Sequence, residues 1–160
     1  MEFNDNLFLE YKYLLETTNI QECYQHMMKF INYLYLKLKN ELNIYSFSSK
    51  VIENKMNFSY FQLTNQKLKE RGLKIQVIFM HESCCFEIWL SGYNRKIQNE
   101  YYKIINTIEL PFQLCMDPNK DDYIVKLLIN ENLTVANIEK VIFEIKDQIK
   151  KIDLMVETLL

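Results

Sequence analysis

Apolar residues near the start of the chain recur every three or four positions, a spacing that places them on one face of a helix. The pattern predicts a short helix over residues 6–16 and a longer helix from residue 20 to about residue 42. Thr17, Thr18 and Asn19 offer a cap between the two. Both helices carry more apolar side chains than one narrow stripe needs. We therefore expect them to pack on each other as a hairpin and also on a sheet.

The clearest strand pattern is LKIQVIFMHESCCFEIWLSG, residues 73–92, which we interpret as two antiparallel strands. If Glu82 and Ser83 form the turn, six apolar side chains face one another in pairs on one side of the hairpin. A shift of the register by one residue would scatter them, so this pairing is self-consistent. The expected pairs are Phe79 with Phe86, Val77 with Ile88 and Ile75 with Leu90.

The opposite face of this hairpin is mixed, neither as apolar as a core nor plainly solvated. It holds charged, polar, aliphatic and aromatic side chains together. Its expected members are Lys74, Gln76, Ile78 and Met80 on the first strand and Ser91, Trp89, Glu87 and Cys85 on the second.

The remaining elements are shorter or less regular, and residues 44–54 show no periodic pattern. Strand propensity, caps and turn residues define them. In chain order they are a strand at 56–64, a helical turn closed by Gly72, a helix from Asn94 to about Ile108 that Pro111 stops, strands at 113–116 and 123–129 joined by the turn DPNKDD, and a last helix that Thr134 or Asn137 caps and that runs almost to Leu160.

This order of elements predicts an α+β fold, with helices segregated from an antiparallel sheet. We expect about five strands, two N-terminal helices, one middle helix and a long C-terminal helix. The length of 160 residues suits one domain, residues 1–160, and 49% hydrophobic residues are enough for a sizeable core.

Composition excludes several classes of function. Only two Gly and two Pro are present, which argues against a glycine-rich phosphate loop and against a proline-rich linker. The net charge of −2 gives no global basic field, so no nucleic-acid partner is expected.

The chain opens with an acidic, polar segment, MEFND, which is unlike a secretory leader. No uninterrupted apolar stretch approaches the roughly 18 residues of a membrane span, so no membrane partner is expected. We therefore expect a cytoplasmic protein whose four cysteines are reduced.

The junction between the hairpin and the middle helix is the leading candidate site. The first turn of this helix carries Arg95, although cations are unfavourable at the positive end of a helix. Asn94 is the expected N-cap. A pocket floored by Trp89, with Arg95, Gln98 and free helix N–H groups at its wall, could bind a small anion. Glu87 lies on the strand that leads into it.

The alternative for this junction is a structural one. Arg95 would pair with Glu87 or Glu82, and Trp89 would pack under a helix. We expect a carboxylate to hold Arg95, with Glu87 the leading candidate, because the break at Gly92 turns the first helical turn back towards that strand.

The stretch FEIWLSGYNRKIQ, from Phe86 to Gln98, also resembles a signature of a family of small uncharacterised bacterial proteins. That signature reads F-E-[IV]-W-L-x-G-x-N-R. The resemblance implies a bacterial cytosolic protein and no assigned activity.

Two other clusters are weaker candidates for chemistry. The stretch HESCC holds His81, Cys84 and Cys85, but consecutive residues of a strand point to opposite faces, so we expect no metal site. The acids around Asp121 and Asp122 fit a solvated turn. With no ordered Ser-His-Asp set and no glycine loop, no cofactor is expected and the case for an enzyme is weak.

The last helix has an apolar seam with spacings of four and three, the pattern of a heptad repeat. A helix that lies across a sheet has the same spacing. A third possibility combines the two. The first half of the helix packs on the sheet, and the second half, past Lys151, packs against a partner subunit in a homodimer. The seam consists of Ile138, Ile142, Ile145, Ile149, Ile152, Val156 and Leu159.

Two functions of different classes remain. The first is a non-catalytic binding or interaction module for a protein partner or a small anionic ligand. Its element order is similar to that of type III secretion chaperones, which are small, acidic, dimeric and cytosolic. The second is an enzyme whose site lies at Glu87, Trp89 and Arg95, which would require a deep pocket reached by Glu87, Arg95 and His81.

Overall fold

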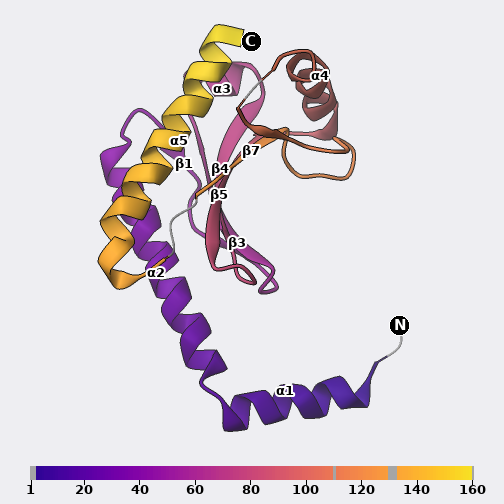
Figure 1. The fold of residues 1–160 in the computed structure, drawn as a ribbon, viewed down its shortest axis with the longest axis vertical. Helices are drawn as coiled ribbons and strands as arrows, with labels where there is room; N and C mark the ends of the chain where they lie inside the picture. Colours follow the sequence, from indigo (N-terminus) through magenta and orange to yellow (C-terminus); the bar gives the residue numbers. More distant parts are fainter. Residues whose placement is uncertain (1–2, 110, 130–132, 160) are drawn as a thin grey trace.

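An antiparallel sheet of seven strands forms the centre of the fold in the part of the chain that the structure describes (Figure 1). This structure is a computed structural model, and it describes residues 3–109, 111–129 and 133–159. The strand order is β1-β3-β4-β5-β7-β6, and β2 pairs with β3 on the same edge as β1. The strands are β1 (Ser46–Phe47), β2 (Ile52–Asn54), β3 (Phe58–Thr64), β4 (Leu73–Met80), β5 (Cys85–Gly92), β6 (Gln113–Leu114) and β7 (Val125–Leu128).

The helices lie outside this sheet, so the predicted α+β class is confirmed. The five expected strands are present, and β1 and β2 are additional. Both lie in the segment without a periodic pattern, because strands of two or three residues are too short to show one. The helices are α1 (Asp5–Thr17), α2 (Ile20–Glu41), α3 (Gln66–Glu70), α4 (Arg95–Ile105) and α5 (Ile138–Leu159), with a 3₁₀ turn η1 (Val135–Asn137) before the last.

The hairpin of β4 and β5 has the predicted register, in which Phe79 pairs with Phe86 and both are buried. The other four apolar members of that face are buried too. The expected two-residue turn is wrong. The last pair of the ladder is Met80 with Cys85, so residues 81–84 form the connection, and Cys84 adopts a left-handed conformation with φ 50°.

Helices α2 and α5 cover the apolar face of the sheet, and ion pairs such as Lys37–Glu139 and Lys146–Glu41 join them (Figure 1). The seam of α5 is buried from Ile142 to Val156 within the chain's own core. A partner subunit therefore cannot reach Val156. The expected dimer contact through the second half of this helix is wrong, because packing on the sheet uses the same spacing.

Helix α1 does not form the predicted hairpin with α2. It projects away from the sheet at the far end of α2 (Figure 1), and none of its residues is buried. The connection explains this. Thr18 is extended, with φ −129° and ψ 166°, and ends α1, while Asn19 already precedes α2. Because these two residues end one helix and begin the next, no loop is left that could turn α1 back along α2.

Phe86 tests the buried face of the hairpin. Phe86→Ala should lower the free energy of unfolding by about 3–5 kcal/mol, because the side chain is only 2% exposed and its removal leaves a cavity. Urea denaturation measures the change. Phe143, which is 69% exposed on α5, is the matched control, and Phe143→Ala should change stability by about 0.5 kcal/mol or less. Equal effects of the two substitutions would contradict the register.

Candidate functional site

The face of the sheet that points away from α2 and α5 is the mixed face of the hairpin. Trp89 lies at its centre and is buried between two other rings. The ring centroids of Phe58 and Tyr123 lie 5.8 Å and 5.1 Å from that of Trp89. Aromatic side chains of the sheet and its loops therefore cover much of this face.

Glu87 is fixed inside this face and is not a free acid. Its carboxylate accepts a hydrogen bond of 2.6 Å from Trp89 Nε1 and forms an ion pair of 3.0 Å with Lys126. The expected pair of Glu87 with Arg95 is wrong. Strand β7 places Lys126 directly opposite Trp89, so this lysine supplies the cation that the buried carboxylate needs.

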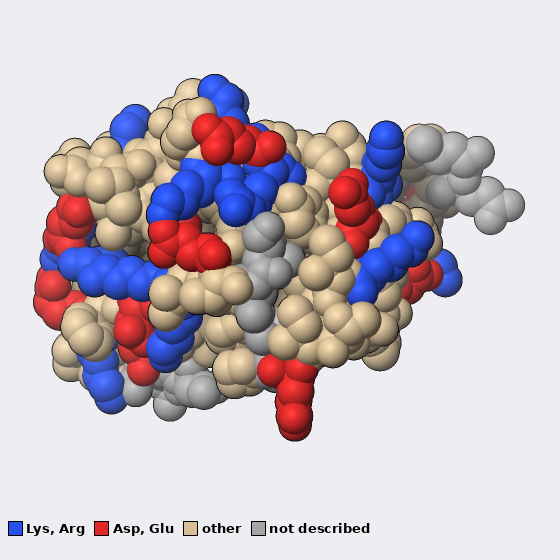
Figure 2. Space-filling model, turned by 90° about the horizontal axis from the view of Figure 1, so that it is seen from above, with Lys and Arg blue, Asp and Glu red and all other residues tan. Residues whose placement is uncertain are grey.

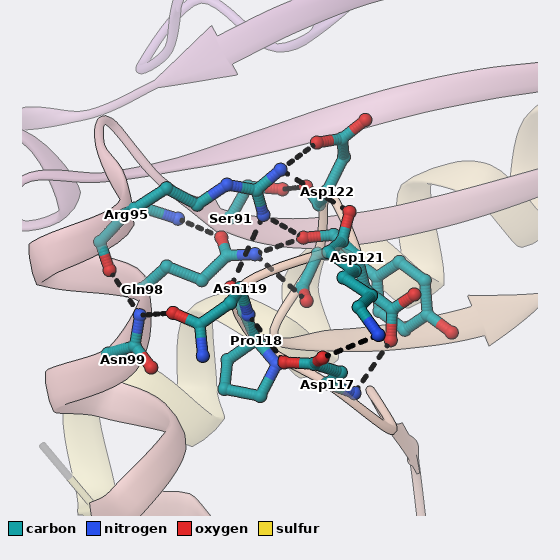
Figure 3. A network of polar contacts seen from close by, with 12 residues as sticks. Ser91, Arg95, Gln98, Asn99, Asp117, Pro118, Asn119, Asp121 and Asp122 are labelled. Carbon is teal, nitrogen blue, oxygen red and sulfur yellow. Dashed lines mark hydrogen bonds and ion pairs between the residues drawn. The ribbon is translucent and has the colours of Figure 1, made fainter.

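Arg95 reaches in another direction, to the loop of residues 117–122 (Figure 3). Its guanidinium donates to Asp122 Oδ1 at 2.7 Å and to the carbonyl oxygens of Pro118, Lys120 and Asp121. A carboxylate therefore does hold the cation at the start of α4, as expected, but it belongs to Asp122. Because Arg95 and Asp122 are both half exposed, the ion pair itself contributes about 1 kcal/mol or less.

Gln98 is the side chain that joins α4 to the sheet, and it is only 3% exposed. Its Oε1 accepts a hydrogen bond from the N–H of Gly92 at the end of β5. Its Nε2 donates to the carbonyl oxygens of Asp121 and Tyr123 (Figure 3). Gly92 permits this approach, since a Cβ there would lie 2.6 Å from the backbone nitrogen of Gln98. Asn94 caps α4 as expected, with its side chain accepting from the N–H of Ile97.

A cavity of about 470 Å³ lies between the start of α4 and the edge of the sheet formed by β2 and β3. Trp89, Asn94, Arg95 and Gln98 line it, which brings together four of the five candidate residues. Glu87 does not line it. The other lining residues are Ile52, Glu53, Asn54, Phe58, Tyr60, Lys74, Gln76, Gly92, Tyr93 and Asp122.

Lys74 is the cationic cavity residue without an ion pair to a described carboxylate, and sequence reasoning did not single it out. Its side chain is half buried, its ammonium lies 6.0 Å from the ring centroid of Tyr93, and no described carboxylate forms an ion pair with it. Burial lowers the pKa of Lys74 below its ordinary value, while the charge of Asp122 partly opposes the shift. The predicted register already placed Lys74 on the mixed face, and that was the available signal.

The expected enzyme arrangement, with Glu87, Arg95 and His81 around one pocket, is not formed, because only Arg95 of the three lines this cavity. His81 lies elsewhere, with its Nε2 2.9 Å from Ser59 Oγ. Ser59 is 1% exposed and so cannot attack a substrate. Burial lowers the pKa of His81, and the charge of Glu53 opposes that shift.

The described cysteine and acidic side chains do not form a cluster that could bind a metal ion. All four cysteines are free thiols, with Cys23 and Cys84 exposed and Cys115 buried. Burial is the main cause that raises the pKa of Cys115 to about 11. Over residues 3–109, 111–129 and 133–159, no group of three or more His, Cys, Asp and Glu side chains is placed to hold a metal ion.

These features define an α+β protein with a lined cavity on the uncovered face of its sheet. The chain belongs to the DUF7000 family, a domain of unknown function that matches residues 4–160. This agrees with the resemblance to an uncharacterised family. Comparison with curated proteins and with solved structures gives no match. None of the helices in the described residues is long and apolar enough to cross a membrane.

Glu87 and Lys126 should be energetically coupled, whereas Glu87 and Arg95 should be independent. In a double-mutant cycle, Glu87→Gln with Lys126→Met should show a coupling of about 0.5–3 kcal/mol in the free energy of unfolding. The same cycle with Arg95→Met should be additive within about 0.5 kcal/mol. Urea denaturation of the five variants and the unmodified chain measures both. The reverse result would mean that the two cations are assigned to the wrong acids.

Proposed function

We propose that this protein is a non-catalytic binding module that takes a small organic anion with a planar part into the cavity beside α4. Lys74 carries the proposal: it is a half-buried ammonium, inside a cavity, without an ion pair to any described carboxylate. A buried charge that lacks a partner costs stability, and an anionic ligand would remove that cost.

The rest of the lining fits the planar part of such a ligand. Phe58, Tyr60, Trp89 and Tyr93 supply aromatic surface around Lys74, and Gln76 and Asn94 supply polar groups beside it. The other charged side chains of the lining already have partners. Arg95 pairs with Asp122, and Glu53 accepts a hydrogen bond of 2.6 Å from Tyr24.

A small anion fits better than a polyanion. Figure 2 shows basic and acidic side chains beside one another over the described part of the face seen from above. A nucleic acid would need an extended basic surface. The proposal keeps the expectation of a bacterial, cytoplasmic protein that folds as one domain.

The enzyme alternative remains the second hypothesis for the same cavity, but no specific observation favours it. Its expected acid, Glu87, is held by Trp89 and Lys126 outside the lining. A general acid or base would have to lie within hydrogen-bond reach of a bound molecule, directly or through one water.

Trp89 is the single tryptophan of the chain, so fluorescence excited selectively in tryptophan, and not in the 11 tyrosines, reports on the floor of this cavity. Titration with benzoate, phenyl phosphate and adenosine monophosphate, each against its neutral counterpart benzamide, phenol or adenosine, tests the proposal. At least one anion should give a saturable change and bind about tenfold or more tightly than its counterpart, because a charge-assisted hydrogen bond to Lys74 is available.

Lys74→Met should abolish this preference for the anion, while Lys69→Met should keep it. Lys69 is an exposed lysine on α3 outside the cavity, so it is the matched control. If every anion binds no better than its neutral counterpart, or if both substitutions have the same effect, the proposal is wrong.

The same substitution should raise the stability of the unliganded protein. At neutral pH the charged form of Lys74 bears the cost of burial, and methionine removes it. The gain should shrink as the pH rises through the lowered pKa of Lys74, because the lysine then becomes neutral in the folded state. Thermal unfolding at several pH values measures this. A loss of about 3–5 kcal/mol would instead show that Lys74 is part of a buried pair.

A further inference from the structure

Gln76 carries a buried amide of which one end has a hydrogen-bond partner and the other end has none. Its side chain is 7% exposed and lies in the middle of β4, on the face that holds the cavity. The amide oxygen accepts a hydrogen bond of 2.7 Å from Ser91 Oγ. The amide nitrogen donates to no atom of residues 3–109, 111–129 and 133–159. Such a group is unusual inside a protein, because burial without a hydrogen bond is costly.

The end of this amide that has no partner opens into the cavity beside α4. Among the described residues, no side-chain nitrogen or oxygen is both sealed from solvent and without a hydrogen-bond partner. Gln76 Nε2 has no such partner, so it must reach open space, and the cavity that Gln76 lines is that space. A ligand group placed there would complete the hydrogen bonding of the amide.

Lys74 and Gln76 present two polar side chains to the cavity at a spacing that the strand determines. They are two residues apart on β4, so they share one face and their Cα atoms are about 6.6 Å apart. Trp89 lies directly opposite Gln76 on β5 and also lines the cavity. A ligand that reaches both polar side chains would place an anionic group at Lys74, a flat ring beside Trp89 and a second polar group at Gln76.

The second polar group of the ligand should be neutral. Glu53 and Asp122 line the same cavity, so a second anionic group would meet negative charge there. A hydroxyl group avoids this repulsion. It also both donates and accepts a hydrogen bond, so it can pair with either atom of a side-chain amide. A hydroxyl group is therefore the ligand group that fits the open end of Gln76.

We propose that the cavity selects aromatic acids that carry a hydroxyl group on the opposite side of the ring from the acid, and that Gln76 recognises this hydroxyl group. The inference rests on the proposed function, because Lys74 still holds the acid. It adds a specificity for the uncharged end of the ligand, which the charge of Lys74 does not provide.

Titration calorimetry with 4-hydroxybenzoate and 4-methylbenzoate tests this selection. At neutral pH both carry one negative charge, and the methyl group replaces the hydroxyl group at nearly the same size. The unmodified chain should bind 4-hydroxybenzoate about tenfold or more tightly, since the methyl group leaves the amide without a partner. Gln76→Met should remove this preference and keep the preference for benzoate over benzamide, which depends on Lys74. Gln62→Met is the matched control and should change neither preference, because Gln62 lies directly opposite Gln76 on β3 and outside this cavity.

The nuclear magnetic resonance signal of the Gln76 side-chain amide gives a second measurement on the unmodified chain, which holds even if Gln76→Met destabilises the fold. Binding of 4-hydroxybenzoate should shift this signal more than binding of 4-methylbenzoate does. Equal affinities for the two acids, equal shifts, or a failure of both acids to bind overturns the inference. The proposed function stands in those cases as long as another anion binds better than its neutral counterpart. If no anion does, the proposed function is wrong and the inference fails with it.

Discussion

The position of α4 depends on the buried amide of Gln98. Its oxygen accepts from the end of β5, and its nitrogen donates to two carbonyl oxygens of the segment that leads into β7. A buried amide cannot lose these partners without leaving polar groups unsatisfied, which costs about 1–3 kcal/mol for each. The hydrogen bonds therefore fix the helix, the strand end and the 117–122 loop as one unit, and this unit forms one wall of the cavity.

The cavity exists because the helices are distributed unevenly about the sheet. Helices α2 and α5 take the apolar face, and the other face is covered only by its own side chains and by the start of α4. This leaves a polar and aromatic surface on which each charged side chain needs an oppositely charged partner close by. Glu87 has Lys126, and Asp122 has Arg95. Lys74 pairs with no described carboxylate, although its ammonium lies 6.0 Å from the ring centroid of Tyr93 and is influenced by the charge of Asp122, and that difference singles it out.

The sequence was sufficient where one short-range pattern determines the structure. The register of β4 and β5 follows from a period of two along 20 residues, and Asn94 is a cap by residue type and position. The sequence was insufficient where segments distant in the chain meet. Arg95 binds a loop more than 20 residues away, and no local pattern shows whether Glu87 or Asp122 is its acid.

The errors about the helices have a similar origin. A spacing of three and four describes both a helix on a sheet and a helix in a dimer, so α5 could not be assigned from its seam. The apolar residues of α1 predicted that it packs on α2 and on the sheet, and this prediction is wrong. The direction of α1 depends on the backbone at Thr18, which residue types alone do not determine.

The ionisation of Lys74 is the most direct test of an anion-binding cavity. Nuclear magnetic resonance of the lysine side-chain carbons can follow each lysine through a pH titration, with Lys74→Met identifying the signal. Lys74 should titrate below the ordinary lysine range in the free protein. A bound anion should move its pKa upward, because the anion favours the charged ammonium. A pKa in the ordinary range that no bound anion moves would contradict the account.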